Sequence, residues 1–235
     1  FAIRFGQKKN TLELSWQGEE DPLEPTAQPR EYIVYTRIGR GGFDNGVRVS
    51  SPSHTVKIEP GIVYSFKVTA VNRGGESFPS EILAAYKAKR EKGQILIVNG
   101  FDRISGPAVI DTPDTAGFDL SQDPGVPYLY DISLCGAQQN FSRKEAGRRL
   151  GESSDEYEGM KIIGNTFDYP FVHGKATQAA GNYSFVSCSD EAVENGTVTL
   201  EDYPVVDYIL GMEKEDPAHK VYYKTFSSAM QRFIT

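Results

Sequence analysis

The sequence predicts a multidomain chain in which an all-β sandwich precedes a three-layer α/β domain with a mostly parallel sheet. Two patterns indicate this, and they meet near residue 92. Before that point apolar and polar residues alternate, as in half-buried antiparallel strands. After it come continuous apolar runs at 95–98 and 205–210, which are typical of parallel strands buried on both faces. The length of 235 residues also favours two domains, and we place them at 1–90 and 93–235, each with its own core.

Charge and composition narrow the classes of function. The formal net charge of −7 argues against nucleic acid as a partner, because phosphate binding needs a clustered basic surface. No apolar run approaches the roughly 20 residues of a membrane span. The chain begins at Phe1 and shows no secretory signal, which we interpret as the mark of a fragment from a longer protein.

Residues 1–90 carry the signals of about seven short strands separated by turns. Leu12, Leu14 and Trp16 alternate with polar residues, which indicates a strand with one buried face. Further strands are expected at 32–37, 47–49, 54–58, 64–70 and 82–86. The pattern predicts an antiparallel sandwich.

Several motifs of this part resemble a fibronectin type III domain, over residues 8–88. They are Trp16, the run IEPGIVY at 58–64, and VTAVN at 68–72 followed by Gly75 and Ser77. The resemblance implies that Tyr64 is a corner tyrosine whose hydroxyl bonds to nearby main chain, and the turn at 60–61 offers carbonyls for it. It also implies a rigid spacer as the default role. Phe43 or Phe78 could stack on a sugar, although each also fits a partly buried core position.

Residues 93–235 alternate between strand and helix signals. Strands are expected at 94–98, 184–188 and 205–210, and helices at 142–151, from Asp168 to Gly181, before Gly196 and at 226–234. In the helix after Asp168, Pro170 fits the first turn. Its apolar face is expected to consist of Phe171, Val172, Ala176, Ala179 and Ala180. Three parallel strands bury little surface, so we expect an incomplete sheet that continues in the parent protein.

The second part is similar to an α/β domain that follows a fibronectin type III module in large secreted bacterial proteins named xanthan lyase. The matching segments are ILIVNGFDRI at 95–104, GNTFDYPFVHGKA at 164–176, 184–187 and 205–211. Some of these proteins also carry an N-acetylmuramoyl-L-alanine amidase domain. The resemblance implies a secreted, periplasmic or cell-surface location, with polysaccharide or peptidoglycan and the parent's other domains as partners.

A more distant resemblance is to the flavodoxin-like fold of class I glutamine amidotransferases. Their nucleophile sits on a sharp turn with a Gly-x-Cys-x-Gly type of sequence, and this chain has none. The resemblance therefore implies a fold and no activity.

Candidate site residues follow from the rule that ligands of open α/β sheets gather at the carboxyl ends of the strands. These positions hold Asn99, Asp102, Arg103, Ser187, Cys188 and Asp190. His173 is the best candidate for a general base, because imidazole ordinarily titrates near neutral pH, and Asp168 could orient it from the same helical turn.

Each candidate also has a structural interpretation. Asp102 with Arg103 fits a loop salt bridge, His173 fits a hydrogen-bonded structural histidine, and Cys188 fits a small buried hydrophobe or a bridge to Cys135. Asp207 interrupts an apolar strand: it must be paired or protonated if it is buried, and otherwise it marks an exposed edge.

The sequence leaves three hypotheses of function. The first is a non-catalytic accessory segment of a larger secreted or cell-envelope protein that acts on polysaccharide or peptidoglycan. The second is a hydrolase or lyase with Asp102 and His173 at the lip of the α/β cleft, and the third is adhesion through the sandwich. No metal site or cofactor is predicted, because the three histidines are scattered. We favour the first, since no set of nucleophile, base and orienting residue can be assembled.

Overall fold

The computed structural model describes residues 1–18, 26, 28–77, 79–100, 108–111, 116–119, 168–210 and 224–234. The chain divides into two compact units: Arg103–Thr166, and Phe1–Asp102 together with Phe167–Thr235. In the smaller unit the described residues form an antiparallel hairpin of β10 (Ala108–Asp111) and β11 (Ala116–Asp119). Asp102, Arg103, Phe78, Cys135 and the helix predicted at 142–151 lie outside the described residues.

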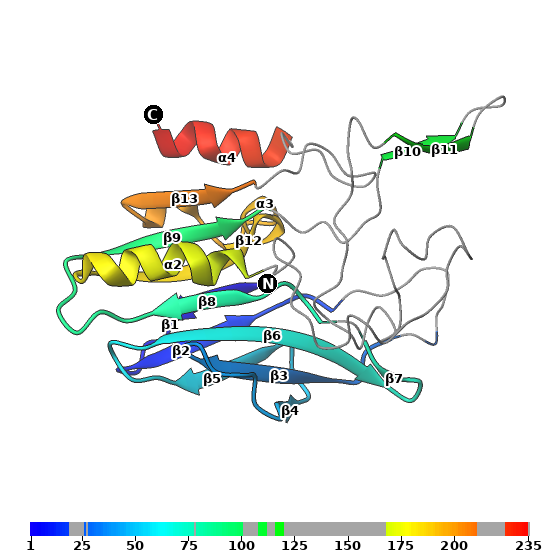
Figure 1. Ribbon diagram of the computed structural model, residues 1–235, viewed down its shortest axis with the longest axis horizontal. Helices are drawn as coiled ribbons and strands as arrows, with labels where there is room; N and C mark the ends of the chain where they lie inside the picture. The colour runs from blue at the N-terminus through cyan, green and yellow to red at the C-terminus, as the bar shows by residue number, and fades with distance from the viewer. Residues whose placement is uncertain are drawn as a thin grey trace, which may run out of the picture. The chain divides into compact units, whose positions relative to one another are not determined.

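The first part of the larger unit is an all-β sandwich (Figure 1). Its strands are β1 (Ala2–Phe5), β2 (Thr11–Ser15), β3 (Glu31–Ile38), β4 (Val47–Val49), β5 (Ser53–Lys57), β6 (Val63–Asn72), β7 (Gly75–Glu76) and β8 (Leu83–Tyr86). One layer has the order β1-β2-β5 and the other β4-β3-β6-β8, with β7 beside the end of β6. All of these pairs are antiparallel. The predicted sandwich is confirmed, and only β1 and β7 were missed.

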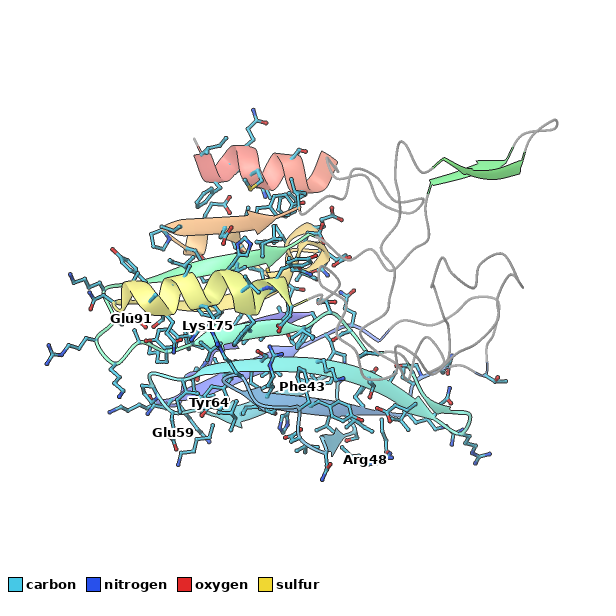
Figure 2. The ribbon with its side chains drawn as sticks, in the orientation of Figure 1. Phe43, Arg48, Glu59, Tyr64, Glu91 and Lys175 are labelled. Atoms are coloured by element: carbon cyan, nitrogen blue, oxygen red, sulfur yellow. The ribbon has the colours of Figure 1, made fainter. Side chains whose placement is uncertain are left out.

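Alternation along the strands explains the sandwich core. In β2, Leu12 and Leu14 are fully buried while Glu13 between them is exposed. Tyr64 is also buried, and its hydroxyl accepts a hydrogen bond of 3.1 Å from the main-chain amide of Glu59. Figure 2 labels both residues at the lower edge of the sandwich. The predicted bond from the Tyr64 hydroxyl to main chain is confirmed, but its partner is an amide and not a carbonyl.

The second part of the larger unit is a short parallel sheet with helices, which we call the parallel part. Its strands are β9 (Gly93–Asn99), β12 (Tyr183–Ser189) and β13 (Val205–Ile209), in the order β12-β9-β13. Its helices are α2 (Tyr169–Ala180), α3 (Asp190–Glu194), a 3₁₀ turn (Leu200–Asp202) and α4 (Lys224–Ile234). The three strands, α2 and α4 begin and end within two residues of the predicted ranges, and α3 ends before Gly196 as predicted. The 3₁₀ turn was not predicted. Whether they belong to a complete α/β domain stays a prediction.

Helix α2 uses a different face from the predicted one. Pro170 lies in its first turn and Gly181 ends it in a left-handed conformation with φ of 83°, as expected. Its buried residues, however, are Pro170 and Gly174, whereas the predicted core residues Val172 and Ala176 are exposed. Ala179 and Ala180 are exposed as well. A Cβ on Gly174 would lie 2.1 Å from the ring of Phe185, so the missing side chain is what lets the helix approach β12 closely.

Strand β12 joins the two parts into one sheet. It pairs antiparallel with β8 at Phe185 and Tyr86, and with β1 at Cys188 and Ala2 (Figure 1). Buried side chains of the sandwich, such as Leu83, belong to the same core as Leu96 and Val98 of β9. The expectation of two separate cores is therefore wrong, because the free edges of β8 and β1 are both taken by β12. The domain bounds at 1–90 and 93–235 stay a prediction.

A second apolar layer lies between α2 and the sheet. Tyr86 and Phe185 stack there at 6.1 Å, and Val63 of β6 and Ile97 of β9 belong to the same cluster. The helix thus packs on strands of both parts (Figure 1).

Candidate functional site

His173 of α2 lies against Asp207 of β13. Its Nδ1 is 2.7 Å from Asp207 Oδ2, and the two side chains are 37% and 40% exposed. Asp207 is thus paired, although its side chain is partly exposed. A carboxylate at Nδ1 favours the tautomer with the proton on that nitrogen, which leaves Nε2 as a proton acceptor. The pair has the geometry of a base with its orienting residue.

Asp168 does not orient His173, because it binds Arg37 of β3. The Arg37 guanidinium is 2.7 Å from Asp168 Oδ2, and the two side chains are 13% and 15% exposed. Burial raises the pKa of Asp168 above its ordinary range, against the opposing effect of the Arg37 charge. The ion pair links the sandwich to the start of α2.

Arg37 has further partners around this ion pair. Its guanidinium donates a 2.9 Å hydrogen bond to Ser65 Oγ and lies 4.7 Å from the ring centre of Phe171 and 5.1 Å from that of Phe43. The ring of Phe43, labelled in Figure 2, therefore makes a cation–π contact with Arg37. Lys67 Nζ lies 4.9 Å from the centre of the same ring. Sequence reasoning missed Arg37, because its carboxylate partner is 131 residues away and no local pattern marks it.

Ser187 serves the join between the two parts. Its hydroxyl donates to the carbonyl of Ala84 at 2.8 Å and accepts from the Ala84 amide at 2.8 Å. Both groups lie in a buried environment, so the hydroxyl replaces a main-chain partner for β8. Ser187 is structural in this arrangement.

Cys188 is a buried free thiol, and burial raises its pKa well above the ordinary value. The thiol is therefore protonated at neutral pH and is a poor nucleophile. Side chains alternate along β12, and Phe185 faces α2, so Cys188 three residues later faces the opposite side of the sheet. His173 and Cys188 cannot act as a dyad across the sheet.

The other two described candidates lie at the carboxyl edge of the sheet. Asn99 is buried and stands opposite Ser189 in the parallel ladder. Asp190 is in the first turn of α3, where its carboxylate accepts a 3.1 Å hydrogen bond from the Glu191 amide. The structure thus places Asn99 and Asp190 at one edge and His173 with Asp207 on the α2 face.

A second group of polar side chains lies on the outer face of the sandwich. Glu76 Oε1 accepts hydrogen bonds from Tyr35 at 2.6 Å and from Thr69 at 2.7 Å. The Tyr35 hydrogen bond is the largest effect lowering the pKa of Glu76, and the same bond raises the pKa of Tyr35. Glu76 is therefore a carboxylate at neutral pH, and Tyr35 is a phenol.

Within the described ranges, His, Cys, Asp and Glu side chains form no group of three that could hold a metal ion. Among the helices that the structure describes, none has the length and apolarity to cross a membrane.

Comparisons with known proteins find matches to part of the chain among solved structures. No family model matches the chain, and neither does any curated protein. Among solved structures, it is similar to a fibronectin type III domain of human collagen XX, with 20% identity over 35% of this chain and 84% of that one and a TM-score of 0.27.

The chain is also similar to the third fibronectin III domain of the human KIAA0343 protein, with 18% identity over 36% of this chain and 77% of that one and a TM-score of 0.27. A third match is the twitchin kinase region from C. elegans, with 18% identity and a TM-score of 0.32 over 59% of this chain. The chain spans 23% of that twitchin structure. Fibronectin type III domains are therefore among the structural neighbours of this chain.

Proposed function

We propose that this chain is a non-catalytic accessory segment, which holds its neighbours in a fixed arrangement within a larger secreted or cell-envelope bacterial protein acting on polysaccharide or peptidoglycan. The observation that supports it best is the pairing of β12 with both β8 and β1. A strand shared between two parts resists bending at their junction, because bending would break main-chain hydrogen bonds and expose apolar surface.

The connection between β8 and β9 supports the same role. The Ala88 amide donates to Ser184 Oγ at 3.0 Å, and the Lys92 amide donates to the carbonyl of Asn182 at 2.7 Å. Glu91, labelled in Figure 2, binds Ser184 Oγ and lies 2.6 Å from Lys87 Nζ. A free interdomain hinge lacks such bonds, so this connection favours a rigid spacer.

The candidate nucleophiles also fit an accessory role. Ser187 is used by the main chain of Ala84, and Cys188 is a buried thiol. The bacterial, secreted and glycan-related parts of the proposal rest on the sequence resemblance described above. A glycan array probed with the chain tests them. Binding to polysaccharide or peptidoglycan fragments supports a binding role, whereas no binding leaves the spacer role as the one that remains.

Rigidity is tested by distance measurements between two spin labels. The exposed positions Lys57 of β5 and Thr199 before the 3₁₀ turn can be changed to cysteine in a Cys135→Ser background. A narrow distance distribution is expected, and Arg37→Met should broaden it because it removes the ion pair to α2. A broad distribution in the unsubstituted background contradicts a fixed arrangement.

A second candidate function is acid–base catalysis in a hydrolase or lyase, and the 2.7 Å contact between His173 and Asp207 favours it. The test is turnover of polysaccharide and peptidoglycan by the parent protein with His173→Ala or Asp207→Asn. Loss of about 10²–10⁴-fold in both variants supports catalysis. Unchanged turnover in both eliminates it and agrees with the accessory role.

A further inference from the structure

Three Asn–Gly pairs occur in the sequence, at 45–46, 99–100 and 195–196. An asparagine before glycine can lose its side-chain amide without an enzyme. The glycine nitrogen attacks the side-chain carbonyl carbon, and the absence of a Cβ leaves room for this approach. The fold places the three pairs in different environments, because Asn45 and Asn195 are exposed whereas Asn99 is buried.

Asn195 follows the last residue of the short helix α3 (Figure 1). The Thr197 amide donates a 2.9 Å hydrogen bond to Asn195 Oδ1, which holds the side-chain amide beside the intervening Gly196 peptide. Gly196 has a φ of 75°. Apart from its chain neighbours, no described residue has a heavy atom within 4 Å of the position that its Cβ would occupy. The reacting groups therefore start near each other, with open space around them.

Ring closure requires a local opening of this turn. The Gly196 amide donates a 3.1 Å hydrogen bond to the Val193 carbonyl, and ψ of Asn195 is 2°, so the nitrogen must turn toward Cγ before it can attack. The amide is held by a neutral carbonyl at the end of a helix of five residues. The opening therefore breaks few hydrogen bonds and exposes little surface.

The other exposed pair is held more firmly. The Gly46 amide donates a 3.0 Å hydrogen bond to Asp44 Oδ1, which also accepts one of 2.9 Å from the Thr36 amide. The Asp44 carboxylate opposes loss of the proton from the Gly46 nitrogen, because two negative charges would then lie side by side. A Cβ on Gly46 would lie 2.3 Å from the Ile33 side chain, so this turn packs closely on β3.

The buried pair belongs to the end of the parallel sheet. The Gly100 amide donates a 2.9 Å hydrogen bond to the Ile209 carbonyl, and a Cβ on Gly100 would lie 2.5 Å from the Tyr208 ring. Turning the Gly100 nitrogen toward Asn99 would break a bond between strands. Asn99 is therefore an internal standard for a protected pair.

We propose that Asn195 is a site of spontaneous conversion to aspartate and isoaspartate. The Gly196 nitrogen loses its proton to water and forms a bond to Asn195 Cγ. The Cγ–Nδ2 bond then breaks, and Nδ2 takes a proton from water and leaves as ammonia. Water opens the resulting succinimide ring at either carbonyl, which gives aspartate or isoaspartate with no oxidation or reduction. The proposal does not depend on the accessory role of the chain.

Either product is expected to weaken the end of α3. A carboxylate at 195 would lie at the C-terminal end of the helix, where the helix dipole is negative, close in sequence to Glu191 and Glu194. Isoaspartate also lengthens the main chain by one carbon shortly before Val198 and Leu200, which are buried. The converted chain should therefore have a lower Tm.

The test follows all three pairs in one sample of the 235-residue chain during incubation at mildly alkaline pH. Peptide mapping by mass spectrometry measures conversion at each pair, and labelling with protein isoaspartate methyltransferase identifies isoaspartate. In the folded chain Asn195 should convert about tenfold faster than Asn45, which corresponds to a barrier lower by ~1.4 kcal/mol, and Asn99 should stay intact. In denaturant the three pairs should convert at similar rates, because the fold no longer distinguishes them.

Two variants separate this reaction from other chemical damage. Asp44→Ser removes the carboxylate from the Gly46 amide and should speed conversion of Asn45 severalfold without changing that of Asn195. Asn195→Gln should abolish conversion at 195 and the fall in Tm during incubation, since the larger ring closes far more slowly. Faster conversion of Asn45 or Asn99 than of Asn195 in the folded chain overturns the proposal. So does the same unequal ranking in denaturant, or an Asn195 that converts in denaturant but stays intact when folded.

Discussion

The two parts of the larger unit are joined along two seams with different chemistry. In the strand seam, between β8 and β12, the Ser184 and Ser187 hydroxyls bind main-chain groups of Ala88 and Ala84. In the helix seam, between α2 and the sandwich, Arg37 pairs with Asp168, and Gln178 Nε2 donates to the carbonyl of Gly61 at 3.0 Å. In the strand seam the contacts between the two parts are mainly serine hydroxyls on main-chain groups, whereas the helix seam contains an ion pair between the two parts.

The pKa values of the carboxyl groups in the two seams are shifted in opposite directions. Burial acts to raise the pKa of Glu91 in the strand seam, but hydrogen bonds from Lys87, Ser184 and Gln94 outweigh it and the pKa is lowered. Burial raises the pKa of Asp168 in the helix seam and outweighs Arg37. The ionised form is thus favoured where several hydrogen-bond donors contact the carboxylate. It is disfavoured where the carboxylate is more deeply buried and has a single cation as its partner.

The largest effect expected from the shared core is a single unfolding transition for both parts. Trp16, the lone tryptophan, reports on the sandwich by fluorescence, and the described helices of the larger unit report on the parallel part by circular dichroism. The two melting curves should coincide, because unfolding of either part exposes the core of the other. Two separated midpoints would contradict a shared core and support independent domains at 1–90 and 93–235.

Phe185 should be the most costly single position at either seam. Its ring is fully buried, packs against Gly174 of α2 and stacks on Tyr86 of β8. Phe185→Ala is expected to lower the free energy of unfolding by about 3–5 kcal/mol in a denaturant titration. Tyr183→Ala on the same strand is the control, because Tyr183 is 39% exposed and its removal should cost far less.

Removing one partner of the helix-seam ion pair should cost more than removing both. Arg37→Met leaves the nearly buried Asp168 without its cation, and we expect a loss of about 2 kcal/mol in unfolding free energy. Adding Asp168→Asn should recover most of that loss, since no buried charge remains. A double variant less stable than Arg37→Met alone would contradict this account.

Ser187→Ala tests the strand seam in the same way. The change removes the partner of both the amide and the carbonyl of Ala84 in a buried place, and should cost about 1–2 kcal/mol. The cost should not depend on salt, because no charge is involved, whereas that of Arg37→Met should fall as salt rises. Equal salt dependence in the two variants would remove the distinction between the seams.

The smallest effects concern pH, and their signs are opposite. Asp168 has a raised pKa, so its contribution to stability is present below the ordinary Asp pKa and is lost as pH rises through the raised value. Glu91 has a lowered pKa, so its contribution is present above the ordinary Glu pKa and is lost as pH falls through the lowered value. Unfolding free energies of Asp168→Asn and Glu91→Gln, measured against the unsubstituted chain in acid, should differ from it with opposite slopes.

Local sequence patterns were enough to predict most strands and helices, the end of a helix and one side-chain to main-chain hydrogen bond. Alternating Leu12 and Leu14 predicted β2, and Gly181 predicted the end of α2. The position of Tyr64 after its turn predicted a bond to main chain, which Glu59 supplies. These features depend on residues within a few positions of one another, so the sequence contains their causes.

Features that depend on distant residues could not be predicted in this way. The prediction of the apolar face of α2 was wrong, because the face that packs on the sheet carries Gly174. Hydropathy treats glycine as neutral, but this glycine lies against the ring of Phe185. The sequence marked Asp207 as a residue that needs a partner or a proton if it is buried, but only the fold shows that it contacts His173. Asp168 likewise pairs with Arg37, although His173 is nearer in the chain.

The sequence by itself determined the kinds of strand on either side of residue 92, because hydrophobic periodicity is a local consequence of which faces are buried. Tertiary structure alone decided that β12 fills the edges of both β8 and β1, so that the two parts share one core. Edge pairing uses main-chain groups that every residue carries, and so side-chain patterns do not encode which edge a strand will choose.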